Sequence, residues 1–142
     1  MVRGTEPVRG RVLVAGSGQG PLLRLTHPIS FWGGVDPVRG VISDPRHPQF
    51  GASLAGRVLA IPSAVGSSSS SAIMLELLRE KTAPAAILLG RADAILALGA
   101  VVGQELGYDP IPILEVPMEA LGEFPDEGTV DVGRDGSVLL VE

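Results

Sequence analysis

The stretch RVLAIPSAVGSSSSSAIMLELLREKTAPAAILL, from Arg57 to Leu89, contains the alternation that decides the fold. It opens with an aliphatic run at Arg57–Ile61, which Pro62 ends, and it closes with a second run at Ala86–Leu89. Between the two runs, apolar residues recur at helical spacing from about Ser68 to Lys81. This strand–helix–strand order predicts a mixed α/β domain.

The segment between the two predicted strands has the pattern of an amphipathic helix. One stripe of that helix holds Met74, Leu77, Leu78 and Lys81, with Ile73 beside it. The outward side holds Glu76, Arg79 and Glu80. Pro84 cannot continue a helix, so the helix is predicted to end before it.

The remaining chain is cut into short pieces by 19 glycines and 12 prolines. Further strands are predicted at Arg11–Ala15, Leu22–Leu25 and Ile111–Val116, and on both sides of Asp135-Gly136 within Thr129–Val141. A second helix is predicted at Arg91–Val102, and a helical turn at Pro117–Leu121. The expected fold is therefore α/β, with a β-rich body and two principal helices.

Two segments are expected to lack regular structure. Gly16–Gly20 (GSGQG) does not have the Gly-x-Gly-x-x-Gly spacing of a phosphate loop, so a plain turn is predicted there. His27–Gly51 contains His-Pro, Asp-Pro and Gly-Gly pairs that force turns. Because a long ordered loop inside a compact domain is more often functional than idle, this second segment is a candidate part of a site.

Length and composition restrict the possible function. The 142 residues fit one domain over positions 1–142, and 45% apolar residues predict a well-buried core. A net charge of −5, with one Trp, one Tyr and three Phe, argues against nucleic-acid binding. No apolar run approaches the roughly 18 residues of a membrane span, and the N-terminus lacks the apolar region of a signal peptide. These features predict a cytoplasmic protein, and the low charged fraction of 19% indicates surface covered by a partner.

This chain is not expected to bind a metal by itself. It has no cysteine, which removes thiolate ligands, disulfides and a cysteine nucleophile. His27 and His47 lie far apart in the sequence and show no ligand spacing. Any metal chemistry must therefore come from another chain.

The serine run Ser67–Ser71 lies where a predicted strand hands over to a helix, a position that collects ligands in α/β folds. A helix N-terminus leaves about four N–H groups unpaired and carries a partial positive charge, so it can hold a carboxylate or phosphate. Gly66 lets a ligand approach this backbone. Ordinary N-capping and a flexible serine-rich linker are the structural alternatives. A serine hydrolase is disfavoured, because the Gly-x-Ser-x-Gly pattern is missing.

Three motifs, in this order and spacing, resemble the small subunit of aconitase X, an aconitase-related dehydratase. They are SFWGGVDPVRGVI at Ser30–Ile42, HPQFGASLAGRVLAIP at His47–Pro62 and GSSSSS at Gly66–Ser71. The resemblance covers nearly the whole chain and implies the swivelling β/β/α domain of aconitase-like enzymes. It also implies a large partner subunit whose cysteines bind an iron–sulfur cluster, in agreement with the lack of cysteine here.

The resemblance also implies roles for the serine run. Ser67 would be the catalytic base that removes a proton next to a carboxylate, while Lewis-acidic iron takes the leaving hydroxyl. The N–H groups at the helix start would stabilise the serine alkoxide. Gly66, Ser68 and Ser69 would shape the loop and bind the substrate. Aconitase has a substrate-binding arginine where this chain has Ser69, so such an arginine must come from elsewhere, for example from the large subunit.

Two dehydrations are associated with this family. One converts cis-3-hydroxy-L-proline to a pyrroline carboxylate, and the other converts 5-phosphomevalonate to an anhydro product. Archaeal small subunits tend to carry Gly-Ser-Thr at the loop, whereas this chain has Gly-Ser-Ser and a composition typical of bacteria, which favours hydroxyproline. Phosphomevalonate dehydration is the alternative, and a non-catalytic anion-binding or regulatory module is another.

The loop-rich segment contains further candidate residues. Asp36 either lines the substrate cleft or serves as a turn aspartate before Pro37. Trp32 is expected to be a core or interface anchor rather than a substrate contact. The remaining polar residues are expected to be solvated surface residues: His27, Arg39, Arg46 and His47.

Overall fold

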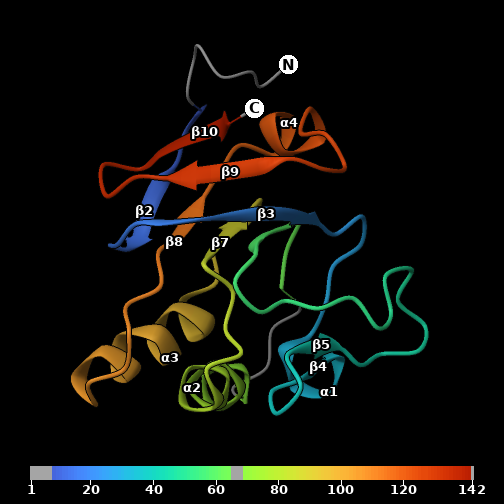
Figure 1. Cartoon of the computed structure of the whole chain (residues 1–142), viewed down its shortest axis with the longest axis vertical. Coiled ribbons are helices and arrows are strands. Elements are labelled where there is room, and N and C mark those ends of the chain that lie inside the picture. Colours follow the sequence, from blue (N-terminus) through green and yellow to red (C-terminus); the bar gives the residue numbers. More distant parts are fainter. Residues whose placement is uncertain (1–7, 65–68, 142) are drawn as a thin grey trace.

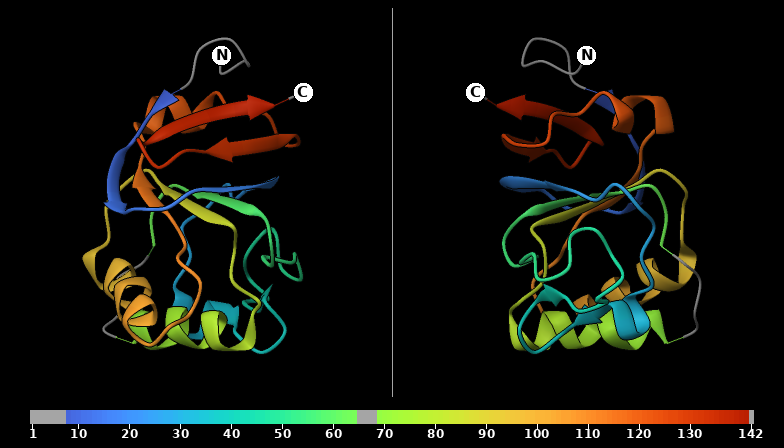
Figure 2. Two further views of the ribbon diagram at one scale, coloured as in Figure 1. Left: turned by 60° about the vertical axis from the view of Figure 1, so that its left-hand side comes forward. Right: turned by 90° about the vertical axis from the view of Figure 1, so that its right-hand side faces the viewer.

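Three layers make up the structure, a computed structural model that describes residues 8–64 and 69–141. A central, mostly parallel sheet lies between an outer layer of antiparallel strands and a layer of helices (Figures 1 and 2). The predicted β/β/α architecture with two principal helices is therefore confirmed.

Within the described residues, one large sheet holds eight strands. They are β1 (Val8–Arg9), β2 (Arg11–Val14), β3 (Gly18–Arg24), β6 (Val58–Ile61), β7 (Ala86–Leu89), β8 (Ile113–Glu115), β9 (Thr129–Val132) and β10 (Ser137–Val141). Their order is β1-β10-β9-β3-β6-β7-β8-β2. β3, β6, β7 and β8 run parallel, while β9 joins β3 and β2 joins β8 in antiparallel register. β9 and β10 form the predicted hairpin, with Gly136 at φ +87° in its turn.

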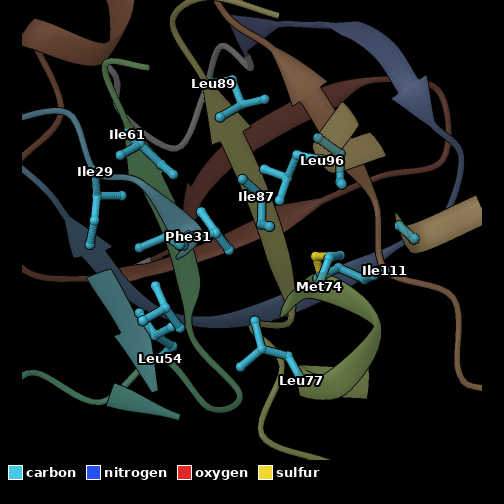
Figure 3. Packing of buried hydrophobic residues seen from close by; sticks show 14 of the residues in the cluster. Ile29, Phe31, Leu54, Ile61, Met74, Leu77, Ile87, Leu89, Leu96 and Ile111 are labelled. Atoms are coloured by element: carbon cyan, nitrogen blue, oxygen red, sulfur yellow. The ribbon is translucent and has the colours of Figure 1, made fainter. Parts of the chain in front are cut away.

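Alternating side chains on the central strands separate two hydrophobic cores. On β6, Leu59 and Ile61 pack toward the helices, whereas Val58 and Ala60 pack toward the outer strands. β7 follows the same rule, and Figure 3 shows the core on the helix side. Because both faces of these strands are buried, their sequences read as continuous aliphatic runs.

Strand β3 belongs to both β layers. Its first half, Gly18–Pro21, pairs with β9, and its second half, Leu22–Arg24, pairs with β6. The plain turn predicted at Gly16–Gly20 is therefore wrong from Gly18 onward. A Cβ atom on Gly18 would lie 2.2 Å from the carbonyl oxygen of Ala85, so the glycine is needed for this close backbone approach rather than for a turn.

Four helices are described: α1 (Phe31–Gly34), α2 (Ser70–Glu80), α3 (Ala94–Glu105) and α4 (Met118–Gly122). Met74, Leu77 and Leu78 are buried, as predicted for the apolar stripe of α2. Lys81 was wrongly placed on that stripe: it is the left-handed C-cap (φ 60°), and its side chain is exposed. α3 begins later than predicted, because Asp93 caps its N-terminus.

Two glycines allow α2 and α3 to pack closely. A Cβ on Gly99 would lie 2.5 Å from the carbonyl oxygen of Ser71 and 2.8 Å from Cβ of Met74. One turn later, a Cβ on Gly103 would lie 2.4 Å from a methyl group of Leu78. The beginning of α2, where the serine run ends, is thus held against the middle of α3.

The loop-rich segment is an excursion with a core of its own. It contains α1 and a two-stranded ribbon of β4 (Val35–Asp36) and β5 (Val41–Ile42). Phe31, Ile42 and Leu54 are fully buried and join the helix-side core (Figure 3 shows Phe31 and Leu54). The segment is therefore less irregular than its turn-forming residues predicted.

No helix in residues 8–64 and 69–141 combines the length and the apolar character that crossing a membrane requires.

Candidate functional site at the carboxyl edge of the parallel strands

The parallel strands β3, β6, β7 and β8 end at one edge of the central sheet, and ligands of α/β proteins commonly bind at such an edge. The serine run follows β6 in the sequence, and its described residues Ser69–Ser71 are the N-cap and the first two residues of α2. Gly66, Ser67 and Ser68 lie outside the described residues, and their predicted roles stay predictions.

The described serines of the run differ in their surroundings. Ser69 is the N-cap of α2, but its side chain makes no capping bond to the helix. Ser70 is fully buried on the same face as Met74 and Leu77, and its Oγ has no hydrogen-bond partner among the described residues. Five serines in sequence therefore do not make five equivalent site residues. The predicted substrate contact of Ser69 stays a prediction.

Residues just before the Ser30–Ile42 motif lie beside the segment that leads into the serine run. Ile29 and Ala64 form a parallel β-bridge, and the Ile29 N–H donates to the Ser63 carbonyl at 3.3 Å. Trp32 lies three positions after Ile29 and is 59% exposed, so the predicted core role is wrong, and an interface or substrate contact stays a prediction. The residues that immediately precede two of the three motifs thus lie side by side.

Asp36 is engaged within its own turn. One carboxylate oxygen accepts the N–H groups of Val38 (3.0 Å) and Arg39 (3.2 Å), and the other accepts Nε of Arg39 at 2.9 Å. These bonds, above all the one from the Arg39 side chain, hold the pKa of Asp36 below its usual value. The structure therefore shows the turn role, and a substrate contact by Asp36 stays a prediction.

His47 is buried, so the predicted surface position is wrong. Its Nδ1 accepts the N–H of Gln49 at 3.0 Å, and its Nε2 lies 3.2 Å from the His27 carbonyl oxygen. This imidazole connects two parts of the excursion that lie 20 positions apart in the sequence. His27 is exposed as predicted, and so are Arg39 and Arg46, although each of these arginines pairs with an aspartate (Asp36 and Asp44).

The connection from β7 to α3, Gly90–Asp93, forms a second part of the edge that sequence analysis missed. The Gly90 N–H donates to the carbonyl of Ile61, the last residue of β6, at 2.9 Å. The Ala92 N–H donates to the Glu115 carboxylate at 3.0 Å, and this bond, together with one from Arg11, lowers the pKa of Glu115. Asp93, directly before an apolar helical run, was the available sequence signal for this N-terminus.

Side chains from β3, α4 and the segments beside them line a further part of this edge. A shallow hollow is lined there by Arg24, Thr26, Pro62, Met118 and Leu121, among others. The Arg24 guanidinium is bound within the chain, to the Leu121 carbonyl (3.3 Å) and to Asp126 (3.0 Å). Arg24 therefore stabilises the wall of the hollow.

Comparison with known proteins identifies the family. The family model for the aconitase X swivel domain matches residues 7–141. The chain belongs to the aconitase X swivel-domain family. The crystal structure of Thermococcus kodakaraensis aconitase X in its holo form superposes with a TM-score of 0.85 at 31% identity, covering 96% of this chain and 99% of that one. The resemblance in the three motifs is thus confirmed.

Two curated relatives show how aconitase X swivel domains occur. A cis-3-hydroxy-L-proline dehydratase of Pseudomonas aeruginosa is 50% identical over 131 residues, which are 88% of this chain but 23% of that protein. A phosphomevalonate dehydratase small subunit of Methanothermobacter thermautotrophicus is 40% identical over 126 residues, covering 88% of this chain and 92% of that one. The chain thus spans about a quarter of the first relative and nearly all of the second.

This aconitase X swivel domain does not have the residues to hold an iron–sulfur cluster. Clusters are bound mainly by cysteine thiolates, and the sequence contains none. Across residues 8–64 and 69–141, no three His, Cys, Asp or Glu side chains gather as metal ligands. Both nitrogens of the buried His47 are already engaged within the chain.

Proposed function

We propose that this chain is the small, swivelling subunit of a hydro-lyase that dehydrates cis-3-hydroxy-L-proline to a pyrroline-2-carboxylate. The observation that carries the proposal is the 50% identity over 131 residues to a dehydratase of that substrate. Phosphomevalonate dehydration is the second candidate, because relatives of that name match this chain along nearly their whole length.

Ser67 is the proposed catalytic base. In the reaction, the Cα–H bond next to the carboxylate and the neighbouring C–OH bond both break, a double bond forms and water leaves. A serine alkoxide is too costly at neutral pH unless its negative charge is stabilised. The run of serines between β6 and α2 supports this role, because a helix N-terminus carries partial positive charge.

The proposed partner is a large subunit that carries the iron–sulfur cluster. Two observations support a partner: several relatives are named as small subunits, and the Pseudomonas relative contains much additional chain. A third is the outer face of α3, which exposes large apolar side chains at helical spacing: Ile95, Leu98, Val101, Val102 and Leu106. A helix that is apolar on all sides is usually buried, so a protein surface is expected to cover this face.

The proposal is tested by co-expressing this chain anaerobically with the cysteine-bearing large subunit from its genomic neighbourhood and measuring dehydration of cis-3-hydroxy-L-proline. Turnover that requires both chains is expected. Turnover of 5-phosphomevalonate instead would select the second candidate. An intact iron–sulfur complex that dehydrates neither substrate would contradict the enzymatic proposal and favour an anion-binding or regulatory module.

The role of Ser67 is tested in the same complex with Ser67→Ala. Loss of a general base lowers turnover by about 10²- to 10⁴-fold. The neighbouring Ser71→Ala, on the described first turn of α2, is the matched control and is expected to retain most activity. If Ser67→Ala turned over at the wild-type rate, the base assignment would be wrong.

A further inference from the structure

The arginines of this chain differ in whether they have a carboxylate partner. Six of them are paired: Arg9 with Asp135, Arg11 with Glu115, Arg24 with Asp126, Arg39 with Asp36, Arg46 with Asp44, and Arg79 with Glu76 and Glu80. Arg57 bonds to backbone carbonyls. Within the described part of the chain, the side chains of Arg91 and Arg134 make no hydrogen bond or ion pair.

These two arginines lie in different layers of the fold. Arg134 lies in the turn between β9 and β10, in the outer layer. Arg91 lies two residues after the end of β7, at the carboxyl edge of the parallel strands, and is exposed. Arg91 is therefore the uncommitted guanidinium at the candidate site, and Arg134 is a natural control.

The backbone on both sides of Arg91 is fixed. Gly90 donates its N–H to Ile61 (2.9 Å), and a Cβ on Gly90 would lie 2.6 Å from the Pro62 carbonyl oxygen. On the other side, Ala92 donates to Glu115. This loop is therefore held directly beside the end of β6, where the chain continues toward the serine run.

Two carboxylates interact with the loop that carries Arg91, and both accept hydrogen bonds from other groups. Oδ1 of Asp93 accepts the N–H groups of Ile95 and Leu96, both at 2.9 Å. The two oxygens of Glu115 accept from Arg11 and from the Ala92 N–H. Neither carboxylate pairs with the Arg91 guanidinium, which remains available for an anion from outside the chain.

We infer that Arg91 binds the carboxylate of the substrate. This inference rests on the proposed function, in which the substrate is a carboxylic acid that loses the proton next to that group. A guanidinium matches a carboxylate with two parallel N–H donors and so fixes its orientation as well as its position. A fixed loop one strand away from β6 suits this task, because the backbone that carries the guanidinium does not have to be ordered when the substrate arrives.

The test compares Arg91→Ala, Arg91→Lys and the control Arg134→Ala in the complex with the large subunit. Arg91→Ala is expected to raise KM for cis-3-hydroxy-L-proline by about 10- to 100-fold, the loss typical of one charge-assisted contact. Arg91→Lys keeps the charge without the paired donors, so its KM is expected to lie between those of the wild type and Arg91→Ala. Arg134→Ala is expected to match the wild type. Added ethylguanidinium is expected to restore part of the Arg91→Ala activity.

Equilibrium binding of L-proline gives a second readout that does not need turnover, because proline keeps the carboxylate and lacks the leaving hydroxyl. Weaker binding by Arg91→Ala than by the wild type, with Arg134→Ala unchanged, supports the inference. Equal KM and equal proline affinity in Arg91→Ala and the wild type would overturn it while the dehydratase proposal stands. A wild-type complex that binds proline but dehydrates no substrate would instead overturn the proposed function.

Discussion

Helices α2 and α3 follow neighbouring parallel strands and pack on the same face of the central sheet, yet their outer surfaces differ. On α2, Arg79 contacts the carboxylates of Glu76 and Glu80, both at 2.8 Å. α3 presents Leu98, which is 54% exposed, within an apolar face. Polar residues let α2 face solvent, whereas the exposed apolar face of α3 supports the proposed contact with another protein.

The N-termini of the two helices differ as well. α3 is capped within the chain by Asp93, whose carboxylate accepts two N–H groups. The N-cap of α2 is Ser69, and its side chain makes no such bond. The N-terminal N–H groups of α3 are thus satisfied by a neighbouring side chain, Asp93. The N-terminus of α2 has no such side-chain cap and adjoins the candidate site.

The contact between the two helices is the most sensitive point of this arrangement. Gly99→Val is expected to destabilise the protein by about 1–3 kcal/mol or more, because the new Cβ meets the backbone of Ser71 and Cβ of Met74. Thermal or urea unfolding measures the loss. Gly122→Ala is the control, since nothing lies within 4 Å of its added Cβ. Equal stability of Gly99→Val and the wild type would refute the close packing.

The apolar face of α3 can be tested by adding a charge to it. Leu98→Glu is expected to weaken binding to the large subunit by roughly 10-fold or more, because the carboxylate would be buried without a partner. Gln104→Glu adds the same charge to the exposed side of α3 away from Leu98 and should bind normally. Calorimetry of the two purified subunits measures both affinities. An undiminished affinity of Leu98→Glu would show that the partner binds elsewhere.

Removing the cap of α3 should have a smaller effect. Asp93→Ala is expected to lower the free energy of unfolding by about 1 kcal/mol, the usual cost of losing an N-cap. Asp93→Asn, which keeps a side-chain acceptor, should restore most of the loss. Urea unfolding of both variants measures this difference. If the alanine and asparagine variants were equally stable, Asp93 would not act as a cap.

The smallest expected effect depends on pH and concerns Glu115. Its pKa in the folded protein lies below the usual 4.5, chiefly because of the Ala92 N–H. The ionised carboxylate therefore stabilises the fold above pH 4.5, and this contribution is lost as pH falls through the folded-state pKa. Glu115→Gln should be less stable than the wild type at pH 7, and this difference in stability should become smaller in acid. Melting temperatures of both proteins from pH 7 to pH 3 measure the difference, and a difference that does not change with pH would contradict this account.

Much of the fold was predictable because it is encoded between neighbours in the chain. The aliphatic run at Val58–Ile61, the helical spacing of Met74 and Leu77, and the turn at Asp135-Gly136 each have a local physical cause. Helix boundaries were less accurate, since the beginning of α3 depends on the Asp93 cap. For the site, local sequence located the serine run and its place between a strand and a helix.

Contacts between distant segments decided the rest. Gly18 is in a strand because it pairs with Val132 of β9, and the buried His47 ring reaches the His27 carbonyl. Arg91 joins the candidate site because Gly90 is hydrogen-bonded to Ile61, 29 positions earlier in the sequence. Periodicity and turn propensity describe a residue's neighbours along the chain. They carry no information on which backbone groups from elsewhere will lie against it, and only the packed tertiary structure determines that.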